Sequence, residues 1–287
     1  MSVVTDSWAP NQDELLDKAA GLITPPTVCV RLLALLRSSK ASASDIASVV
    51  SYDPNLAARL LRVANSSYYG LRRRVQTVQR AVTLLGARDL SNFAIAISMT
   101  RTYSALGGGL YDAERFWRHS VYVALTAQQL AKHVGMGESN RLFVAGLLHD
   151  VGSPLLYFER PDLVRKMSQT VASDEDVVAA QERAEFGFSH DSLGARMLSK
   201  WELPDEIVEL VRDHHGAPQV DQSEQSILET SDQLSQWSER GALAFIEAER
   251  RDFGLCARFG LAVSERYPTL LNTVDRDFDQ IIDALGG

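Results

Sequence analysis

Cysteine is scarce in this 287-residue sequence, which contains only Cys29 and Cys256. The two cysteines are far apart and form no CxxC or mixed Cys/His pattern, so neither a disulfide framework nor a cysteine-based zinc motif is expected. Long apolar runs are also missing, because none approaches the ~20 residues that a membrane helix requires. The polar start at residues 1–11 contains an acid and does not resemble a signal peptide. These absences favour a reduced, soluble, cytoplasmic protein without membrane contact.

Positive charge is in deficit, with 29 Lys and Arg residues against 37 Asp and Glu residues and a formal net charge of −8. General attraction to nucleic acid or to an anionic membrane is therefore not expected. The sequence also lacks a Gly-rich phosphate loop, a serine-nucleophile motif, an internal repeat and runs of alternating apolar and polar residues. Apolar residues recur at helical spacing instead, which predicts an all-α protein.

Start and stop signals divide the predicted helices into groups. Asp53-Pro54 is a strong helix start, because an N-cap carboxylate precedes a proline at the first helical position. Gly107-Gly108-Gly109 predicts a joint between two subdomains. The expected organisation is an N-terminal lead-in, an N-terminal helical subdomain, a second helical subdomain and C-terminal flanking helices, at residues 1–21, 22–106, 110–240 and 241–287 respectively.

A metal site is one interpretation of the histidines. His149 and Asp150 are neighbours at the end of an apolar helix, and a divalent metal held by imidazole nitrogen and carboxylate oxygen needs further ligands from other elements. Segments that can fold back onto this pair supply such residues: His119, His190, His214, His215 and Asp232. The candidate metal site therefore comprises seven residues.

A purely structural role for the same residues stays open beside the metal site. A lone histidine on an apolar helix stripe, such as His119, is usually a satisfied core residue. His214 and His215 stand before Gly216, where cationic side chains favour the dipole at a helix end. His133 occupies a similar position before Val134-Gly135 and is left out of the candidate site.

At these residues the chain resembles the HD superfamily of metal-dependent phosphohydrolases, and in particular its HDOD branch. The resemblance spans roughly residues 22–237 and rests on several motifs in a fixed order: Pro25-Pro26, Asp53-Pro54, Ala64-Asn65-Ser66, the stretch 81–86, Phe116-Trp117-Arg118-His119-Ser120, the stretch 145–152, Trp201 with Leu203-Pro204, and His214-His215. It implies an N-terminal helical bundle packed on an HD-like helical core. It also implies a non-catalytic regulator that acts through protein contacts, beside cyclic-dinucleotide or two-component signalling.

The related HD-GYP branch hydrolyses cyclic di-GMP with bound metals, and its motif places a Gly-Lys pair just after the HD pair. Here Gly152 is followed by Ser153 and Pro154, so no amine is available at that position. Arg115 stands where that pattern has a Glu one turn before the first histidine, which puts a second metal site in doubt. The resemblance therefore implies that no cofactor is required, with a divalent metal as a candidate. A metal-dependent phosphohydrolase is the alternative.

Arginine is concentrated between residues 59 and 101, where Asp89 is the only acid. The residues proposed to contact a partner are Arg59, Arg62, Arg72, Arg73, Arg74 and Arg80, and Arg88 and Arg101 extend the segment. Planar guanidinium groups suit an acidic signalling or regulatory protein, although a merely solvated face is the simpler reading. Residues 45–50 and 56–65 also imitate a DNA-binding helix-turn-helix, but similar helices belong to the bundle that the resemblance implies. Cyclic di-GMP as a ligand and a homodimer through a helix at 242–267 remain further candidates.

Overall fold

Helices account for all regular structure in the described part of the chain, which confirms the predicted all-α class. The computed structural model describes residues 11–19, 27–38, 41–66, 69–104, 112–137, 139–162, 175–216, 223–239, 259–260 and 266–285. Its helices are α1 (Gln12–Ala19), α2 (Thr27–Arg37), α3 (Ala43–Ser51), α4 (Pro54–Ala64), α5 (Val78–Leu85), α6 (Ala87–Ser104), α7 (Ala113–His133), α8 (Ser139–Leu148), α9 (Ser153–Glu159), α11 (Glu175–Phe186), α12 (His190–Lys200), α13 (Asp205–Arg212), α14 (Glu224–Glu239) and α17 (Arg266–Leu285). Within these residues no helix is long and apolar enough to cross a membrane.

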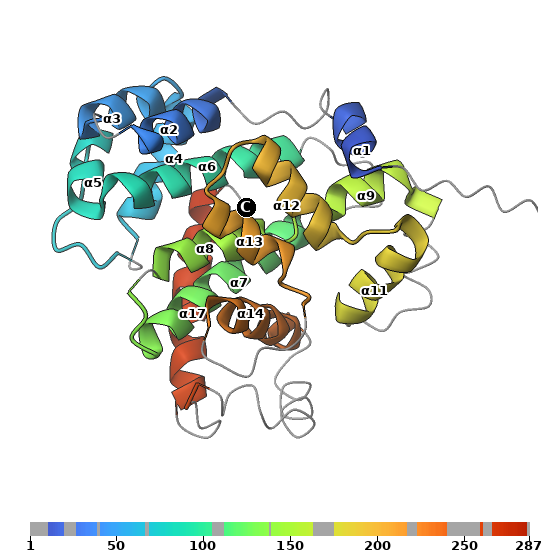
Figure 1. Cartoon of the computed structure of the whole chain (residues 1–287). Coiled ribbons are helices and arrows are strands. Elements are labelled where there is room, and N and C mark those ends of the chain that lie inside the picture. The colour runs from blue at the N-terminus through green and yellow to red at the C-terminus, as the bar shows by residue number, and fades with distance from the viewer. Residues whose placement is uncertain are drawn as a thin grey trace, which may run out of the picture.

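Helices α2 to α6 form the N-terminal bundle, in which α2 and α4 pack on α6 and α3 packs on α5 (Figure 1). The helix limits follow from local side-chain chemistry. The Asp53 carboxylate accepts from the main-chain N–H groups of Asn55 and Leu56 at 2.9 and 3.1 Å, so α4 begins at the predicted Asp53-Pro54 signal. Gly86 has a φ of 94° and follows the last residue of α5.

The second half of the molecule is built around α7, against which α8, α14 and α17 pack. Helix α13 packs on both α8 and α12, and α12 also contacts α9. Helix α6 contacts α7 and α8 and so joins this core to the N-terminal bundle (Figure 1). The predicted joint at residues 107–109 lies outside the described residues.

The C-terminal helix α17 lies within residues 241–287, where flanking helices are expected, although the last individual helix that the sequence predicts ends at residue 267. It packs along α7 and also contacts α4, so it connects the two halves of the molecule. The Tyr122 hydroxyl donates to Asp275 at 3.1 Å, and the Arg118 guanidinium lies 4.9 Å from the centre of the Phe278 ring. Most of the helix predicted at 242–267 lies outside the described residues.

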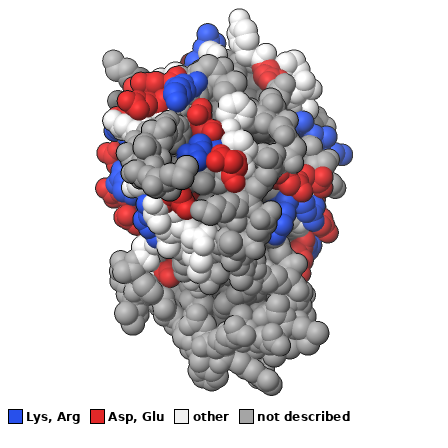
Figure 2. Space-filling model, turned by 90° about the vertical axis from the view of Figure 1, so that its right-hand side faces the viewer, with Lys and Arg blue, Asp and Glu red and all other residues white. Residues whose placement is uncertain are grey.

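The lead-in also contributes an ordered helix, α1, which docks on α12 rather than on the neighbouring α2 (Figure 1). Arg196 on α12 pairs with the Asp13 carboxylate through two contacts of 3.0 Å, and Lys200 lies 2.9 Å from Asp17. Leu15 of α1 is fully buried. Figure 2 shows one side of the molecule, on which the described Lys and Arg side chains are interspersed with the described Asp and Glu side chains.

Two glycines allow backbones to approach closely beside the histidines. A Cβ added at Gly146 in α8 would lie 2.8 Å from the Ala124 Cα in α7. A Cβ added at Gly152, at the start of α9, would lie 2.1 Å from the main-chain oxygen of His190 and 2.7 Å from the Gly194 nitrogen. Because both obstacles at Gly152 are backbone atoms, they cannot rotate away, and α9 can reach α12 only through a glycine.

Gly152→Ala is therefore expected to destabilise the protein by about 1–3 kcal/mol or more, because an added methyl group must push α9 away from α12. Urea unfolding followed by circular dichroism measures the change. Gly137→Ala is the matched control, since a Cβ at Gly137 meets nothing within 4 Å, and a change within about 0.5 kcal/mol is expected. Equal stability of the two variants would contradict the close contact between α9 and α12.

Candidate metal centre

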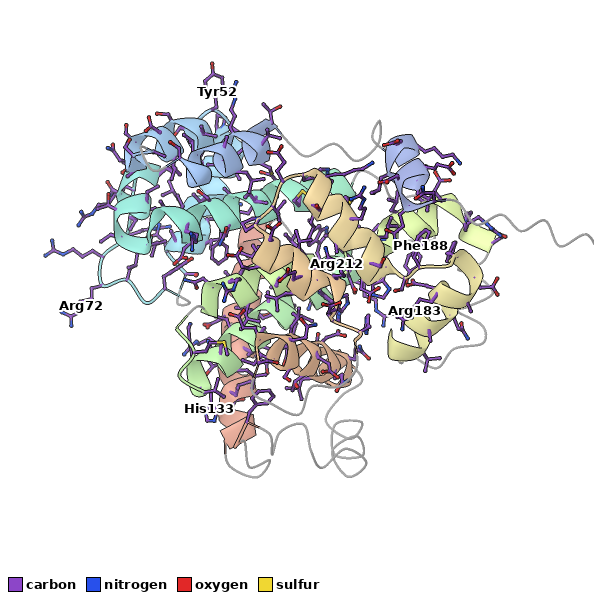
Figure 3. All side chains as sticks on the ribbon, in the orientation of Figure 1. Tyr52, Arg72, His133, Arg183, Phe188 and Arg212 are labelled. Carbon is purple, nitrogen blue, oxygen red and sulfur yellow. The ribbon has the colours of Figure 1, made fainter. Side chains whose placement is uncertain are left out.

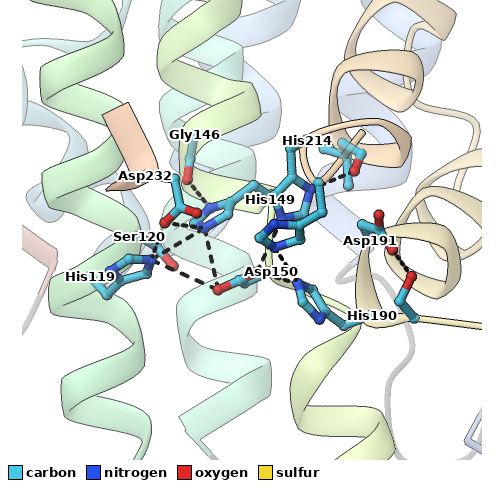
Figure 4. A network of polar contacts seen from close by, with 12 residues as sticks. His119, Ser120, Gly146, His149, Asp150, His190, Asp191, His214 and Asp232 are labelled. Atoms are coloured by element: carbon cyan, nitrogen blue, oxygen red, sulfur yellow. Dashed lines mark hydrogen bonds and ion pairs between the residues drawn. The ribbon is translucent and has the colours of Figure 1, made fainter. Parts of the chain in front are cut away.

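The seven residues of the predicted metal site lie in two groups of possible ligands. Figure 4 labels all of them except His215. His119 lies on α7 and Asp232 on α14, while His190 is the first residue of α12. His149 and Asp150 follow the end of α8, and His214 and His215 follow the end of α13. Each of the seven is buried, with at most 9% of its surface exposed. Residues up to 113 positions apart in sequence, from 119 to 232, therefore form one cluster.

The Asp150 carboxylate lies in the centre and divides the cluster into two groups (Figure 4). Its Oδ2 atom is 3.3 Å from His149 Nε2, and its Oδ1 atom is 3.1 Å from His190 Nε2 and 3.4 Å from His214 Nε2. We call the set on the Oδ2 side the His119 group: His119, His149 and Asp232. We call the other set the His190 group: Asp150, His190, His214 and His215.

Hydrogen bonds at the far side of the imidazole rings fix which nitrogens face the centre. His149 Nδ1 lies 2.7 Å from the Gly146 carbonyl oxygen, and His214 Nδ1 lies 2.7 Å from the Val211 carbonyl oxygen. Because a carbonyl oxygen can only accept, each Nδ1 carries the proton, and Nε2 of a neutral ring is a bare acceptor. Both Nε2 atoms face Asp150, whose oxygens are acceptors too.

Acceptors that face one another at these distances repel unless a proton or a cation lies between them. His214 Nε2 and Asp150 Oδ1 are both buried without a hydrogen-bond partner, and an unsatisfied buried polar group costs about 1–3 kcal/mol. Imidazole nitrogen and carboxylate oxygen are common ligands of divalent transition metals. The donor set and its unsatisfied atoms therefore fit a metal centre.

Charges within the cluster shift the ionisation of its members. Burial favours a neutral imidazole, but the negative charges of Glu182 and Asp150 outweigh this effect and raise the pKa of His190 well above its usual value. Burial likewise favours a protonated Asp150, yet the neighbouring His149 and His190 lower the pKa of Asp150 well below its usual range. The centre therefore concentrates negative charge that either protons on histidine or bound cations must balance.

Two residues at the site are missed by sequence reasoning. Glu182 on α11 lies 2.6 Å from His190 Nδ1, and the Ser235 hydroxyl on α14 lies 3.2 Å from His119 Nδ1. The sequence positions of Glu182 and Ser235 do not indicate that either contacts a histidine, because each contact joins two different helices. Ser189 is the N-cap residue of α12, but its side chain makes no capping hydrogen bond and contacts Asp191 and Arg183 instead.

Residues outside the cluster also have clear positions. His133, which the sequence reading excludes, lies at the end of α7 with its Nε2 atom 3.1 Å from the Phe259 carbonyl oxygen. Ser153 and Pro154, at the place of the HD-GYP lysine, are buried in the first turn of α9. Arg115 is exposed in the first turn of α7, away from any ligand role.

The arginines proposed to contact a partner lie on a different part of the molecule, around α4, α5 and the segment between them. Arg62, Arg72, Arg73, Arg74 and Arg80 are exposed, and Arg59 is half-buried. Figure 3 shows Arg72 extending into solvent from the N-terminal bundle, away from the core helices. These residues and the histidine cluster thus form two separate candidate sites.

Comparison with known proteins gives a consistent family assignment. The model of the HDOD domain family matches residues 22–217. A provisionally assigned phosphohydrolase from Shewanella amazonensis SB2B has a similar structure, with a TM-score of 0.73 and 22% identity over 95% of this chain and 98% of that one. An HDOD domain protein of unknown function from Geobacter sulfurreducens gives a TM-score of 0.69 and 21% identity over 96% of each chain. At these identities the structures show a shared fold.

Among curated proteins, an uncharacterized protein of Treponema pallidum is 22% identical over 209 residues, which are 71% of this chain. The chain spans 40% of the length of that curated relative. The match accordingly concerns a portion of a larger protein.

The two ligand groups predict how metal content responds to substitution. We expect about two divalent cations per chain, one for each group. Asp232→Ala should remove only the cation of the His119 group. Asp150→Ala should lower the metal content of both groups, because the Asp150 carboxylate faces both. Metal analysis of protein dialysed against Mn²⁺ measures the ratio, with Asp162→Ala as a control outside the cluster. Full metal content in Asp150→Ala would contradict a shared carboxylate.

Proposed function

We propose that this chain, which belongs to the HDOD domain family, is a cytoplasmic regulatory module whose histidine cluster holds divalent metal and whose signal passes through protein contacts. The metal-holding part is supported by one observation above all. Bare imidazole nitrogens and the two oxygens of Asp150 converge from both sides, and two of these atoms have no hydrogen-bond partner. A buried arrangement of this kind is costly unless a cation occupies it.

A structural role for the metal follows from where its ligands lie. The ligands come from α7 and α14, from the start of α12 and from the turns after α8 and α13. Cations held by the two ligand groups would fasten these elements together, and binding free energy would become folding free energy. The side chains of His119 and Asp150 are only 9% and 10% exposed, which leaves little room for a substrate to approach.

Phosphoester hydrolysis is the second candidate function, and one observation favours it. A carboxylate with one oxygen directed to each of two ligand groups is suited to hold two metals close together. A divalent cation, when bound, supplies Lewis acidity toward a phosphoryl oxygen. The chain's own residues contribute the ligands and exclude water, but the buried Ser153 and Pro154 provide no positive charge beside the HD pair.

Turnover assays separate the two candidates. We expect purified protein loaded with Mn²⁺ or Mg²⁺ to cleave cyclic di-GMP and bis(p-nitrophenyl) phosphate no faster than buffer does, because Ser153 and Pro154 supply no positive charge just after the HD pair. His149→Ala should behave identically in these assays. Metal-dependent turnover that disappears in His149→Ala would establish the phosphohydrolase and reject the non-catalytic module.

Protein contact is proposed to involve the arginine surface, which comprises Arg59, Arg62, Arg72, Arg73, Arg74 and Arg80. Guanidinium groups bind carboxylates through two parallel hydrogen bonds, so a concentrated set of arginines suits an acidic protein surface. Five of the six are exposed on the N-terminal bundle, and the net charge of −8 makes this concentration of positive charge unusual for the chain. An acidic signalling or regulatory protein is the proposed partner.

Charge reversal at Arg72, Arg73 and Arg74 should abolish recovery of such a partner in a crosslinked pull-down, because it replaces attraction by repulsion. The matched control reverses three exposed basic residues on other helices: Lys18, Arg115 and Arg212. Equal recovery by both triple variants would exclude the arginine surface. Gel shifts with duplex DNA across a salt series test the nucleic-acid alternative, and no salt-dependent shift is expected.

A further inference from the structure

Glu182 makes a buried contact that the metal ligands do not account for. It lies on α11, is only 1% exposed and directs Oε2 to the first residue of α12. This one oxygen lies 2.6 Å from the His190 ring Nδ1 and also accepts from the His190 main-chain N–H at 2.8 Å. The side chain thus holds both the backbone and the ring of the same residue.

The contact replaces the usual helix cap. Helix starts expose N–H groups that a nearby Ser, Thr, Asp or Asn normally satisfies, but the Ser189 side chain makes no such bond at α12. Glu182 satisfies the first of these groups from another helix. Because the same oxygen faces Nδ1, the position of α12 and the orientation of the His190 ring are fixed together.

His190 differs in this respect from other histidines of the cluster. His149 and His214 are held by main-chain carbonyl oxygens, whereas His190 is held by a buried carboxylate. The Oε1 atom of Glu182 is buried without a hydrogen-bond partner, so this carboxylate is kept at a cost. A carboxylate behind a metal-bound imidazole fixes its tautomer and increases the basicity of the nitrogen that faces the metal.

We infer that Glu182 is a positioning residue for the His190 group, acting through His190 on metal affinity at that group and not at the His119 group. With Nδ1 committed to Glu182, the Nε2 atom of His190 faces the centre, 3.1 Å from Asp150 Oδ1 and 3.1 Å from His215 Nε2. The inference rests on the proposed metal binding. It specifies that Glu182, on α11, affects metal affinity at the His190 group.

Metal titration of Glu182 variants tests the inference. Metal-free protein is titrated with Co²⁺, and binding is followed by calorimetry and by the visible absorption of the bound ion. Glu182→Ala should weaken one of two binding events by roughly 10–100-fold and leave the other unchanged. Glu182→Gln should fall between this variant and the parent, because its amide oxygen can accept the same hydrogen bonds without the negative charge.

Two further variants make the test specific. Glu185→Gln changes an exposed residue on the same helix and should bind Co²⁺ like the parent protein. In an Asp232→Ala background, which lacks a ligand of the His119 group, the remaining binding event should be the one that Glu182→Ala weakens. A merely structural role for Glu182 would instead weaken both events together.

The outcomes separate this inference from the proposed function. If the parent protein binds no Co²⁺, the proposed metal binding fails. If the parent binds Co²⁺ and Glu182→Ala binds it with equal affinity, or loses both events equally, the inference about Glu182 is overturned while metal binding stands. If Glu182→Ala does not fold, Glu182→Gln is used in its place. The inference is overturned if Glu182→Gln binds Co²⁺ with the parent's affinity in both binding events and gives the parent's absorption spectrum.

Discussion

The meeting of hydrogen-bond acceptors around Asp150 is the constraint on which the rest of the core depends. Bare imidazole nitrogens face carboxylate oxygens from both sides, and this is tolerable only with positive charge between them. The surrounding helices end where the ligands converge. Helix α8 ends just before His149, α13 ends just before the His214-His215 pair, and α12 begins at His190. The fold brings together groups that repel one another unless something further is bound or protonated.

The residues around the HD pair serve packing as well as chemistry. Gly146 lets α8 approach α7, and Gly152 lets α9 approach α12, in both cases at distances that exclude a Cβ. These contacts place His149 Nε2 within 3.3 Å of His119 Nε2 and bring His190 to Asp150. A chain can therefore keep this motif for its architecture even where the lysine associated with phosphate chemistry is absent. The presence of the motif alone does not indicate turnover.

Local chemistry made part of this structure predictable. The Asp53-Pro54 start and the Gly86 end depend on neighbouring residues only, and the five histidines of the candidate site stand out because the chain has only six. Contacts between distant helices explain the rest. Glu182 caps α12 from another helix and displaces Ser189 from that role, and α17 is stabilised by packing against α7 and α4. Arg115 stands where the HD-GYP pattern has a Glu, and on that ground the sequence puts a second metal site in doubt. The His190 group nevertheless forms a second set of possible ligands, and none of them comes from the helix that carries Arg115.

Charge balance limits what can occupy the centre. Asp150, Asp232 and Glu182 are all buried there, and isolated buried charges are strongly unfavourable. Asp191 is buried beside them, but its charge is balanced by the Arg183 guanidinium, 3.8 Å away. A proton on His190 balances only one of these carboxylates, so protonation of that residue alone leaves an uncompensated negative charge. One divalent cation together with that proton restores neutrality. Two divalent cations exceed the negative charge and would favour an additional anion at the same place. Occupation of both ligand groups would therefore favour an anion such as a phosphate at the centre. Cleavage of that anion, and not metal binding by itself, is then the physical difference between the two functions considered for this fold.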